Sequence, residues 1–235
     1  MKQFFVGTIC IASCWISVPS YGADTNSPAP AEDWWSGFYA GVQAGYGWGT
    51  ANTDFDYAGL GTVFDTSSDP AGFLGGAFVG YRHQAANGLV FGLEADANIS
   101  GQTESGSVYF TGGMPYSPIT GYAEIDWTAS MRARVGYAAD RFLPYITGGL
   151  AVAGANFGYE FVPPPGSNGG NTTMVGWTLG AGTEYAFSEQ VAVRFEYRYS
   201  DYGSSSANLV GPDLTSVGRF DLKTHNALMG LSVRF

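Results

Sequence analysis

The segment "VAVRFEYRYS" (residues 191–200) alternates apolar or aromatic side chains with small, polar or charged ones at every position. Successive side chains of a strand point to opposite faces, so this segment reads as a strand with two unlike faces. One face carries the valines and the aromatic rings, and the other carries Arg194, Glu196 and Arg198. The fold of the chain depends on which of these faces meets water.

Stretches of the same period-2 kind recur along the chain, separated by clusters of Gly, Pro, Asn and Ser. Eight such strands are expected, over residues 36–49, 72–83, 89–100, 121–137, 143–157, 173–187, 191–200 and 220–235. Helical periodicity is missing from the sequence, and the long uncharged stretch 142–159 holds Pro144 and several glycines, which suits a strand better than a helix. An all-β fold follows.

The connections between these strands alternate in length. Short connections cover 84–88, 138–142 and 188–190, whereas the expected loops at 50–71, 101–120, 158–172 and 201–219 are long. This alternation places every tight turn on one rim and every long loop on the other. Bacterial outer-membrane barrels have this arrangement, with the short turns facing the periplasm.

Aromatic residues recur ten residues apart on one face of three expected strands. The pairs are Phe38 with Trp48, Trp127 with Tyr137, and Trp177 with Phe187. Ten residues at about 3.3 Å each, tilted by about 40°, rise about 25 Å, which matches the apolar band between two aromatic girdles. The spacing therefore favours strands that cross a membrane.

Nine charged residues of the expected strands lie opposite the apolar faces. They are Glu94, Asp96, Asp126, Arg132, Arg134, Glu184, Arg194, Glu196 and Arg198. Every strand has an apolar face, and no helix or second sheet is left to cover these faces. In lipid, only a closed barrel satisfies all backbone groups with its apolar side outward. The sequence thus predicts an all-β fold, an eight-stranded up-and-down antiparallel transmembrane β-barrel with a charged lumen.

The charges of both signs fall at one height of this lumen. We expect a salt-bridged plug, the lumen charge network, made of Glu94, Asp96, Arg132, Arg134, Glu184, Arg194, Glu196 and Arg198. The alternative is that these side chains only contact lumen water. A lumen of eight strands has room for little more than side chains.

The first residues have the pattern of a secretory signal peptide. An uncharged apolar segment (4–18) follows Lys2, small residues follow it, and cleavage is expected after Gly22 or Ala23. We therefore expect a signal peptide over 1–23, a periplasmic tail over 24–35 and the barrel over 36–235. Both cysteines lie in the signal segment, and lipidation of Cys14 is the alternative to simple cleavage.

The charge balance and the surroundings of the histidine and acidic residues indicate whether the chain could bind nucleic acid, catalyse a reaction or hold a metal. With 20 acidic and 10 basic residues the chain is acidic, which argues against nucleic acid as a partner. His225 has Lys223 and Ala227 rather than a serine beside it on its face, and the "DFD" of 54–56 lacks the spacing of a calcium loop. No catalytic residue, cofactor site or metal site is predicted, and the chain is expected not to be an enzyme.

Five further parts of the sequence are distinctive: "WWSGFYAGVQAGYGWG" (34–49), "GGAFVGYRHQ" (75–84), "GLEADANISG" (92–101), "MRARVGYA" with "PYITGGLA" (131–151) and "FEYRYSDYG" (195–203). They resemble the outer-membrane β-barrel family of alphaproteobacteria, porin-like proteins that include outer-membrane immunogenic proteins and haemin-binding relatives. The resemblance implies an eight-stranded topology related to the membrane domain of outer-membrane protein A. It also implies that Phe235 serves as an assembly signal for the outer-membrane insertion machinery.

The function expected from these features is that of a structural surface protein in the cell outer membrane, which supports envelope integrity and exposes loops as antigens. Its expected partners are outer-membrane lipid, lipopolysaccharide and the assembly machinery, and the sequence leaves its oligomeric state open. A narrow porin-like channel is one alternative. A surface receptor for haemin is another, with axial ligands from Tyr57, Tyr109, Met114 or Tyr116.

The expected loops also carry eight acidic residues and one basic residue, Arg219. The acids are Asp54, Asp56, Asp65, Asp69, Glu104, Glu160, Asp201 and Asp213. They are expected either to be solvated or to bind divalent cations that bridge to lipopolysaccharide.

Overall fold

The structure is a computed structural model, and it describes residues 34–57, 62–108, 119–161, 166–210 and 215–235. The regular elements of these ranges are all strands. They are β1 (Gly37–Tyr57), β2 (Thr62–Ser68), β3 (Ala71–Gln84), β4 (Leu89–Val108), β5 (Ile119–Tyr137), β6 (Phe142–Phe161), β7 (Gly166–Ala186), β8 (Val191–Val210) and β9 (Thr215–Arg234). In these ranges we find no helix with the length and apolar character needed to cross a membrane.

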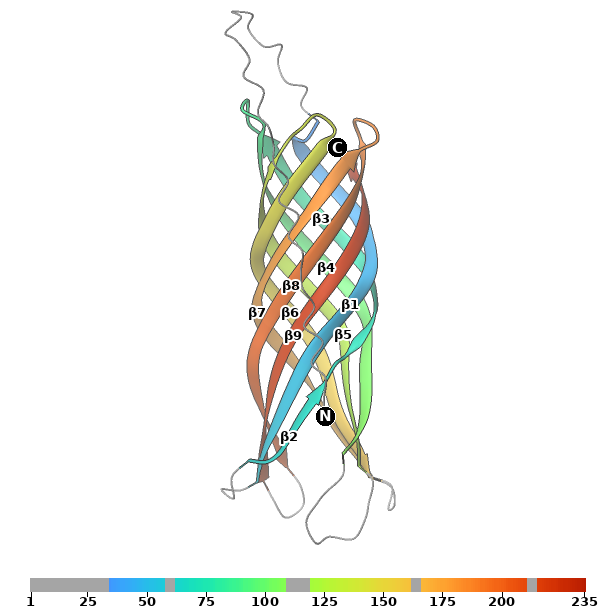
Figure 1. Cartoon of the computed structure of the whole chain (residues 1–235), viewed down its shortest axis with the longest axis vertical. Helices are drawn as coiled ribbons and strands as arrows, with labels where there is room; N and C mark the ends of the chain where they lie inside the picture. The colour runs from blue at the N-terminus through green and yellow to red at the C-terminus, as the bar shows by residue number, and fades with distance from the viewer. Residues whose placement is uncertain (1–33, 58–61, 109–118, 162–165, 211–214) are drawn as a thin grey trace, which may run out of the picture. The chain divides into compact units, whose positions relative to one another are not determined.

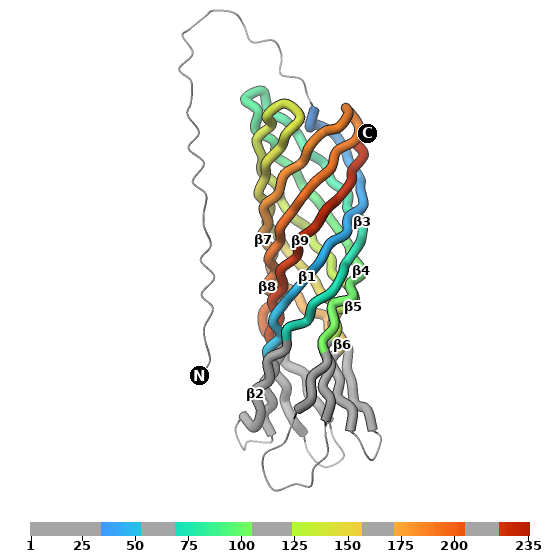
Figure 2. Tube along the Cα trace, turned by 45° about the vertical axis from the view of Figure 1, so that its right-hand side comes forward, coloured from blue at the N-terminus to red at the C-terminus, as the bar shows by residue number. Residues whose placement is uncertain are grey.

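The strands form one closed antiparallel barrel. From β3 to β9 each strand pairs with the next, β1 pairs with β3, and β9 pairs back with β1. Figures 1 and 2 show this closure, with the blue β1 lying alongside the red β9. β2 and β3 pair with successive parts of β1, so the two together fill one of the eight strand positions of the barrel. They are separate strands because Pro70, which lies between them, has no backbone N–H to donate. The predicted eight-stranded barrel is therefore confirmed.

The strands extend further toward the loop rim than the sequence predicts. Residues expected in long loops continue the ladder instead, as β4 does to Val108 and β8 does to Val210. The prediction that the acidic residues and Arg219 lie in loops was accordingly wrong for most of them, which lie on strands. They are Asp54 and Asp56 on β1, Asp65 on β2, Glu104 on β4, Glu160 on β6, Asp201 on β8 and Arg219 on β9. Asp69 lies between β2 and β3, and Asp213 falls outside the described residues. The prediction failed because these segments are rich in Gly, Ser, Asn, Asp and Thr, which are typical of loops, while backbone pairing does not depend on side-chain polarity.

The two faces of β8 show that the apolar face of the strand points out of the barrel and the charged face points into it. Phe195 and Tyr197 are 52% and 47% exposed, whereas Arg194 and Glu196 are 1% and 3% exposed. The six aromatic residues of the ten-residue spacing all lie exposed on the outside: Phe38, Trp48, Trp127, Tyr137, Trp177 and Phe187. We call Trp48, Trp127 and Trp177 the loop-side row, and the other three the turn-side row.

The interior is filled in layers. Near the short turns, Trp35, Val90, Leu143, Ala186 and Ala192 form an apolar cluster, which we call the turn-end cluster. Toward the loop rim a second apolar cluster contains Ala51, Ile125, Ala151, Ala153, Met174, Tyr202 and Leu222. Charged and polar side chains occupy the space between the two clusters, and they are the candidate functional site.

Candidate functional site

Strand alternation directs the charged side chains inward. On β4 and β5, Glu94 stands directly opposite Arg132 in the ladder, and on β7 and β8 Glu184 stands opposite Arg194. All eight residues of the predicted lumen charge network are buried inside the barrel, and the structure brings them together into one connected set of ion pairs.

Glu94 is the most connected carboxylate of the set. Its two oxygens lie 2.5 Å from Arg132 Nη2, 2.9 Å from Arg134 Nη1 and 2.7 Å from Arg194 Nη1. The Tyr39 hydroxyl also donates to Glu94, at 2.9 Å. Three guanidinium groups and one hydroxyl therefore surround a single buried carboxylate, which compensates for its loss of water.

Glu196 and Asp96 form a second centre through Arg132 and Arg198. Glu196 Oε1 lies 2.6 Å from Arg132 Nη1 and 2.7 Å from Arg198 Nη2. Asp96 lies 3.0 Å from each of the same two arginines. The Tyr145 hydroxyl donates to Glu196 at 2.7 Å.

Arg82 is a member that the sequence analysis missed. Its Nη1 lies 2.5 Å from Glu184, which also lies 2.5 Å from Arg134. The guanidinium stands over the rings of Trp35 and Tyr39, at 4.8 and 4.4 Å from their centroids. A signal was present, because Arg82 follows the outward Tyr81 and precedes His83 in the alternation of its strand. The set thus contains five arginines and four carboxylates, and we call it the central network.

Neutral side chains complete the central network. Gln43 accepts a hydrogen bond from Arg194 and donates one to Asn98 at 2.6 Å. Two glycines leave room for the lumen tyrosines, because a Cβ on Gly80 would lie 2.4 Å from the Tyr39 hydroxyl and one on Gly182 would lie 2.6 Å from that of Tyr145.

The ion pairs cross the whole width of the lumen. Around the ring of eight positions, β3 lies opposite β7 and β4 lies opposite β8. The pair Arg82–Glu184 joins the first two strands, and Arg194–Glu94 and Arg198–Asp96 join the second two. A small space beside Arg82, Arg134 and Tyr145 has a volume of about 10 Å³, which is at the lower limit for one water molecule.

Asp126 does not join the central network, although the alternation places it on the charged face. The β5–β6 ladder shifts register between Ile125 and Trp127, so a bulge at Asp126 changes which residues face inward. Its carboxylate accepts a hydrogen bond of 2.5 Å from Asn156 instead.

The predicted assembly residue, Phe235, lies at the turn rim. Its side chain is 81% exposed, and its backbone N–H donates to the carbonyl of Phe38 at 2.9 Å. The ring is therefore presented outward while its backbone closes the barrel seam.

The described residues contain no group of three or more His, Cys, Asp and Glu side chains that could hold a metal ion. Of the residues considered as haemin ligands, Tyr57 lies at the end of β1, and Tyr109, Met114 and Tyr116 fall outside the described residues. The charged side chains of the described lumen form ionic cross-links between strands of the barrel.

Comparisons with known proteins agree with this architecture. A family model described as "Outer membrane protein beta-barrel domain" matches residues 25–235. The 31 kDa outer-membrane immunogenic protein of Brucella melitensis is 33% identical, over all of this chain and 97% of the relative. The 22 kDa outer membrane protein of Rhizobium leguminosarum is 30% identical, over 86% of this chain and 78% of the relative.

Among solved structures, the outer membrane protein OprG of Pseudomonas aeruginosa has a similar fold. The TM-score is 0.55 at 14% identity, covering 85% of this chain and 96% of that one.

Proposed function

The chain belongs to the outer-membrane β-barrel family and lies in the outer membrane, and on this premise we propose that it is a non-conducting structural surface protein. In this role the barrel is a rigid anchor that supports envelope integrity and exposes its loop rim, as an antigen, outside the cell. Short turns face the periplasm in such barrels, so the loop rim is the outer one.

The observation that carries this proposal is the set of ion pairs between opposite strands. Arg82–Glu184 and Arg194–Glu94 bridge the lumen at its middle, and apolar clusters fill it on both sides. An ion that entered would have to break several buried charge-assisted hydrogen bonds. A buried charge that loses its partner is left uncompensated, and removing one partner of such a pair costs about 3–5 kcal/mol.

The narrow channel is the first alternative, and a conductance experiment separates the two. Purified protein is reconstituted into planar bilayers, and single-channel current is recorded for the wild type and for Glu196→Ala. We expect no steady current from the wild type. In the variant, Arg132 and Arg198 lose a shared partner, so brief openings are expected. Steady wild-type current would overturn the closed-barrel proposal in favour of the channel.

The surface receptor for haemin is the second alternative, and it comes from the resemblance to family members rather than from a described ligand set. Adding haemin to the same purified protein and recording its absorption spectrum tests it directly. A spectral change that saturates at one haemin per barrel would favour the receptor. A change that keeps growing with added haemin, without saturation, would favour the structural role.

Export and assembly complete the proposal. We propose that residues 1–23 are a cleaved signal peptide, that 24–35 are a periplasmic N-terminal tail, and that the outward Phe235 is recognised by the outer-membrane assembly machinery. Trp34 and Trp35 of this segment already belong to the barrel end, because Trp35 is fully buried in the turn-end cluster. Lipopolysaccharide is the proposed lipid neighbour at the outer leaflet.

A further inference from the structure

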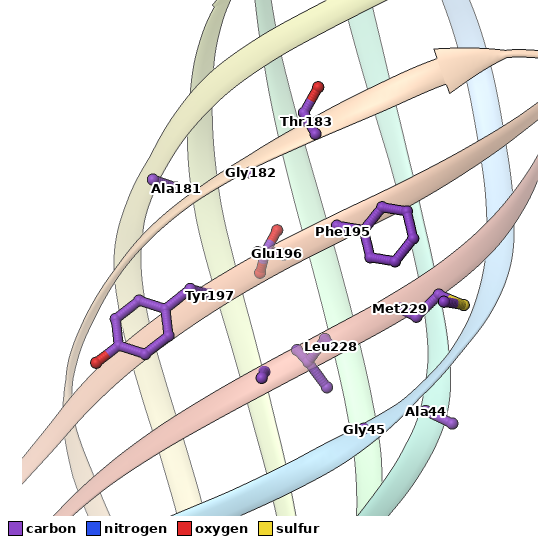
Figure 3. A pocket seen from close by; sticks show the side chains of 11 residues that line it. Ala44, Gly45, Ala181, Gly182, Thr183, Phe195, Glu196, Tyr197, Leu228 and Met229 are labelled. Atoms are coloured by element: carbon purple, nitrogen blue, oxygen red, sulfur yellow. The ribbon is translucent and has the colours of Figure 1, made fainter. Parts of the chain in front are cut away.

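The outer face of the barrel carries a groove that the central network does not explain. It crosses β7, β8, β9 and β1 between the turn-side and loop-side rows and has a volume of about 640 Å³. The side chains of Phe195, Tyr197 and Met229 border it, and its floor is made of alanine and glycine residues (Figure 3). The groove therefore lies in the part of the surface that meets the acyl chains of lipids.

A row of stacked rings continues the groove toward the loop rim. Trp48, His225 and Tyr199 are direct neighbours across β1, β9 and β8. The His225 ring stacks on Trp48 with 5.8 Å between centroids and 10° between planes. The Tyr197 hydroxyl lies 2.6 Å from His225 Nδ1, so the groove and the ring row are joined by a hydrogen bond.

A lysine, Lys223, lies at the end of the ring row that is nearer the loop rim. Lys223 lies two residues beyond His225 on the same exposed face of β9, and no other lysine follows Lys2 in the sequence. It forms no ion pair with any side chain of the described ranges. Its neighbour across the ladder, Asp201, accepts hydrogen bonds from the Gly203 N–H at 2.9 Å and the Tyr199 hydroxyl at 3.4 Å.

We propose that the groove, the ring row and Lys223 together bind one phosphorylated acyl lipid of the outer leaflet. An acyl chain lies in the groove, the glycerol or sugar region contacts the rings, and the phosphate pairs with Lys223. Aromatic rings favour the depth where acyl chains meet headgroups, and a basic side chain beside the headgroups attracts their phosphates. The order along the barrel of apolar groove, amphipathic rings and cation therefore matches the order of acyl chain, glycerol or sugar, and phosphate in the lipid.

The binding experiment uses the purified barrel in an uncharged detergent and native mass spectrometry. The probes are dioleoyl phosphatidic acid, dioleoylglycerol, which has the same chains without the phosphate, and inorganic phosphate. We expect one tightly retained phosphatidic acid per barrel, weaker retention of dioleoylglycerol and no retention of inorganic phosphate. Because Lys223 is the single lysine of the barrel, its acetylation by an amine-reactive reagent should slow when phosphatidic acid is bound.

Three variants separate the parts of the site. Lys223→Gln should weaken phosphatidic acid binding about fivefold and leave dioleoylglycerol unchanged. Ala227→Phe fills the groove and should weaken both lipids. Ala97→Phe is the matched control, because Ala97 is also an exposed alanine, on β4, away from the groove.

Wild-type affinity in both Lys223→Gln and Ala227→Phe would overturn the proposal. So would an equal loss in Ala97→Phe and Ala227→Phe, which would indicate unspecific boundary lipid. If Ala227→Phe converted a dimer to a monomer without changing lipid binding, the groove would be an interface between two copies of the chain. The conductance of the barrel is not involved in any of these outcomes, so the lipid site and the closed-barrel proposal fail separately.

Discussion

The Arg82 guanidinium lies 2.5 Å from the Glu184 carboxylate, although β3 and β7 stand on opposite sides of the barrel. Both side chains are buried, so the pair exchanges the hydration of two charges for a direct contact across the lumen. Such a pair adds little net stability by itself. Its importance lies in the cost of removing only one partner.

Replacing Glu184 with alanine should lower the free energy of unfolding by about 3–5 kcal/mol, because Arg82 loses its carboxylate partner and Arg134 loses one of its two. Urea unfolding in lipid vesicles, followed by tryptophan fluorescence, measures the change. Glu189→Ala is the control, since Glu189 is exposed in the turn before β8. Equal unfolding midpoints for the two variants would show that the central network does not hold the barrel together.

Gly80→Ala should destabilise the barrel by about 1–3 kcal/mol, because the new Cβ would lie 2.4 Å from the Tyr39 hydroxyl and would displace it from Glu94. The same urea titration detects this change. In Gly101→Ala the nearest atom to the added Cβ is the Phe73 carbonyl at 3.5 Å, an ordinary contact, so that variant should unfold like the wild type. A Gly80→Ala midpoint equal to that of Gly101→Ala would contradict the packing described for Tyr39.

Trp35→Ala should cost about 3–5 kcal/mol, because a fully buried ring is removed from the turn-end cluster. The indole N–H also donates to the Asp140 carbonyl at 3.0 Å, and that carbonyl would lose its partner. Trp34→Ala, at a partly buried ring, should cost less. Thermal unfolding of both variants tests this order, and a larger loss in Trp34→Ala would refute it.

Phe235→Asp should reduce the amount of protein in the outer membrane, since a charge replaces the exposed terminal ring at the turn rim. Cell fractionation followed by immunoblotting measures the distribution. Phe187→Asp serves as a control for a charge in place of an exposed ring at the same rim. Similar outer-membrane levels for Phe235→Asp and the wild type would remove Phe235 as an assembly signal.

The alternation of side chains was enough to predict the barrel and the inward position of Arg194, Glu196 and Arg198, because a period of two is preserved along a whole strand. It could not predict which arginine meets which carboxylate. That depends on register between strands distant in the chain, as Arg194 and Glu94 illustrate.

The other differences between the prediction and the structure come from a bulge in β5 and from the polar ends of the strands at the loop rim. Asp126 changes its environment because one extra residue enters β5 at that point, which leaves no mark in the alternation of charges. The ends of the strands at the loop rim were underestimated because Ser-, Gly- and Asn-rich segments such as 166–171 resemble loops while their backbones remain paired. The His225 and Trp48 stack joins β9 to β1, and closure of the barrel brings these strands together.

The contacts between opposite strands also have a consequence for the timing of insertion. Glu94 and Arg194 are 100 residues apart in the chain and meet only when β9 has paired with β1. Until that moment Arg82 and Arg194, whose carboxylate partners stand across the barrel, have water as their main partner, which keeps the growing sheet hydrated along one side. Closure then expels this water in a single late event, so the joining of β9 to β1 and the drying of the interior should coincide.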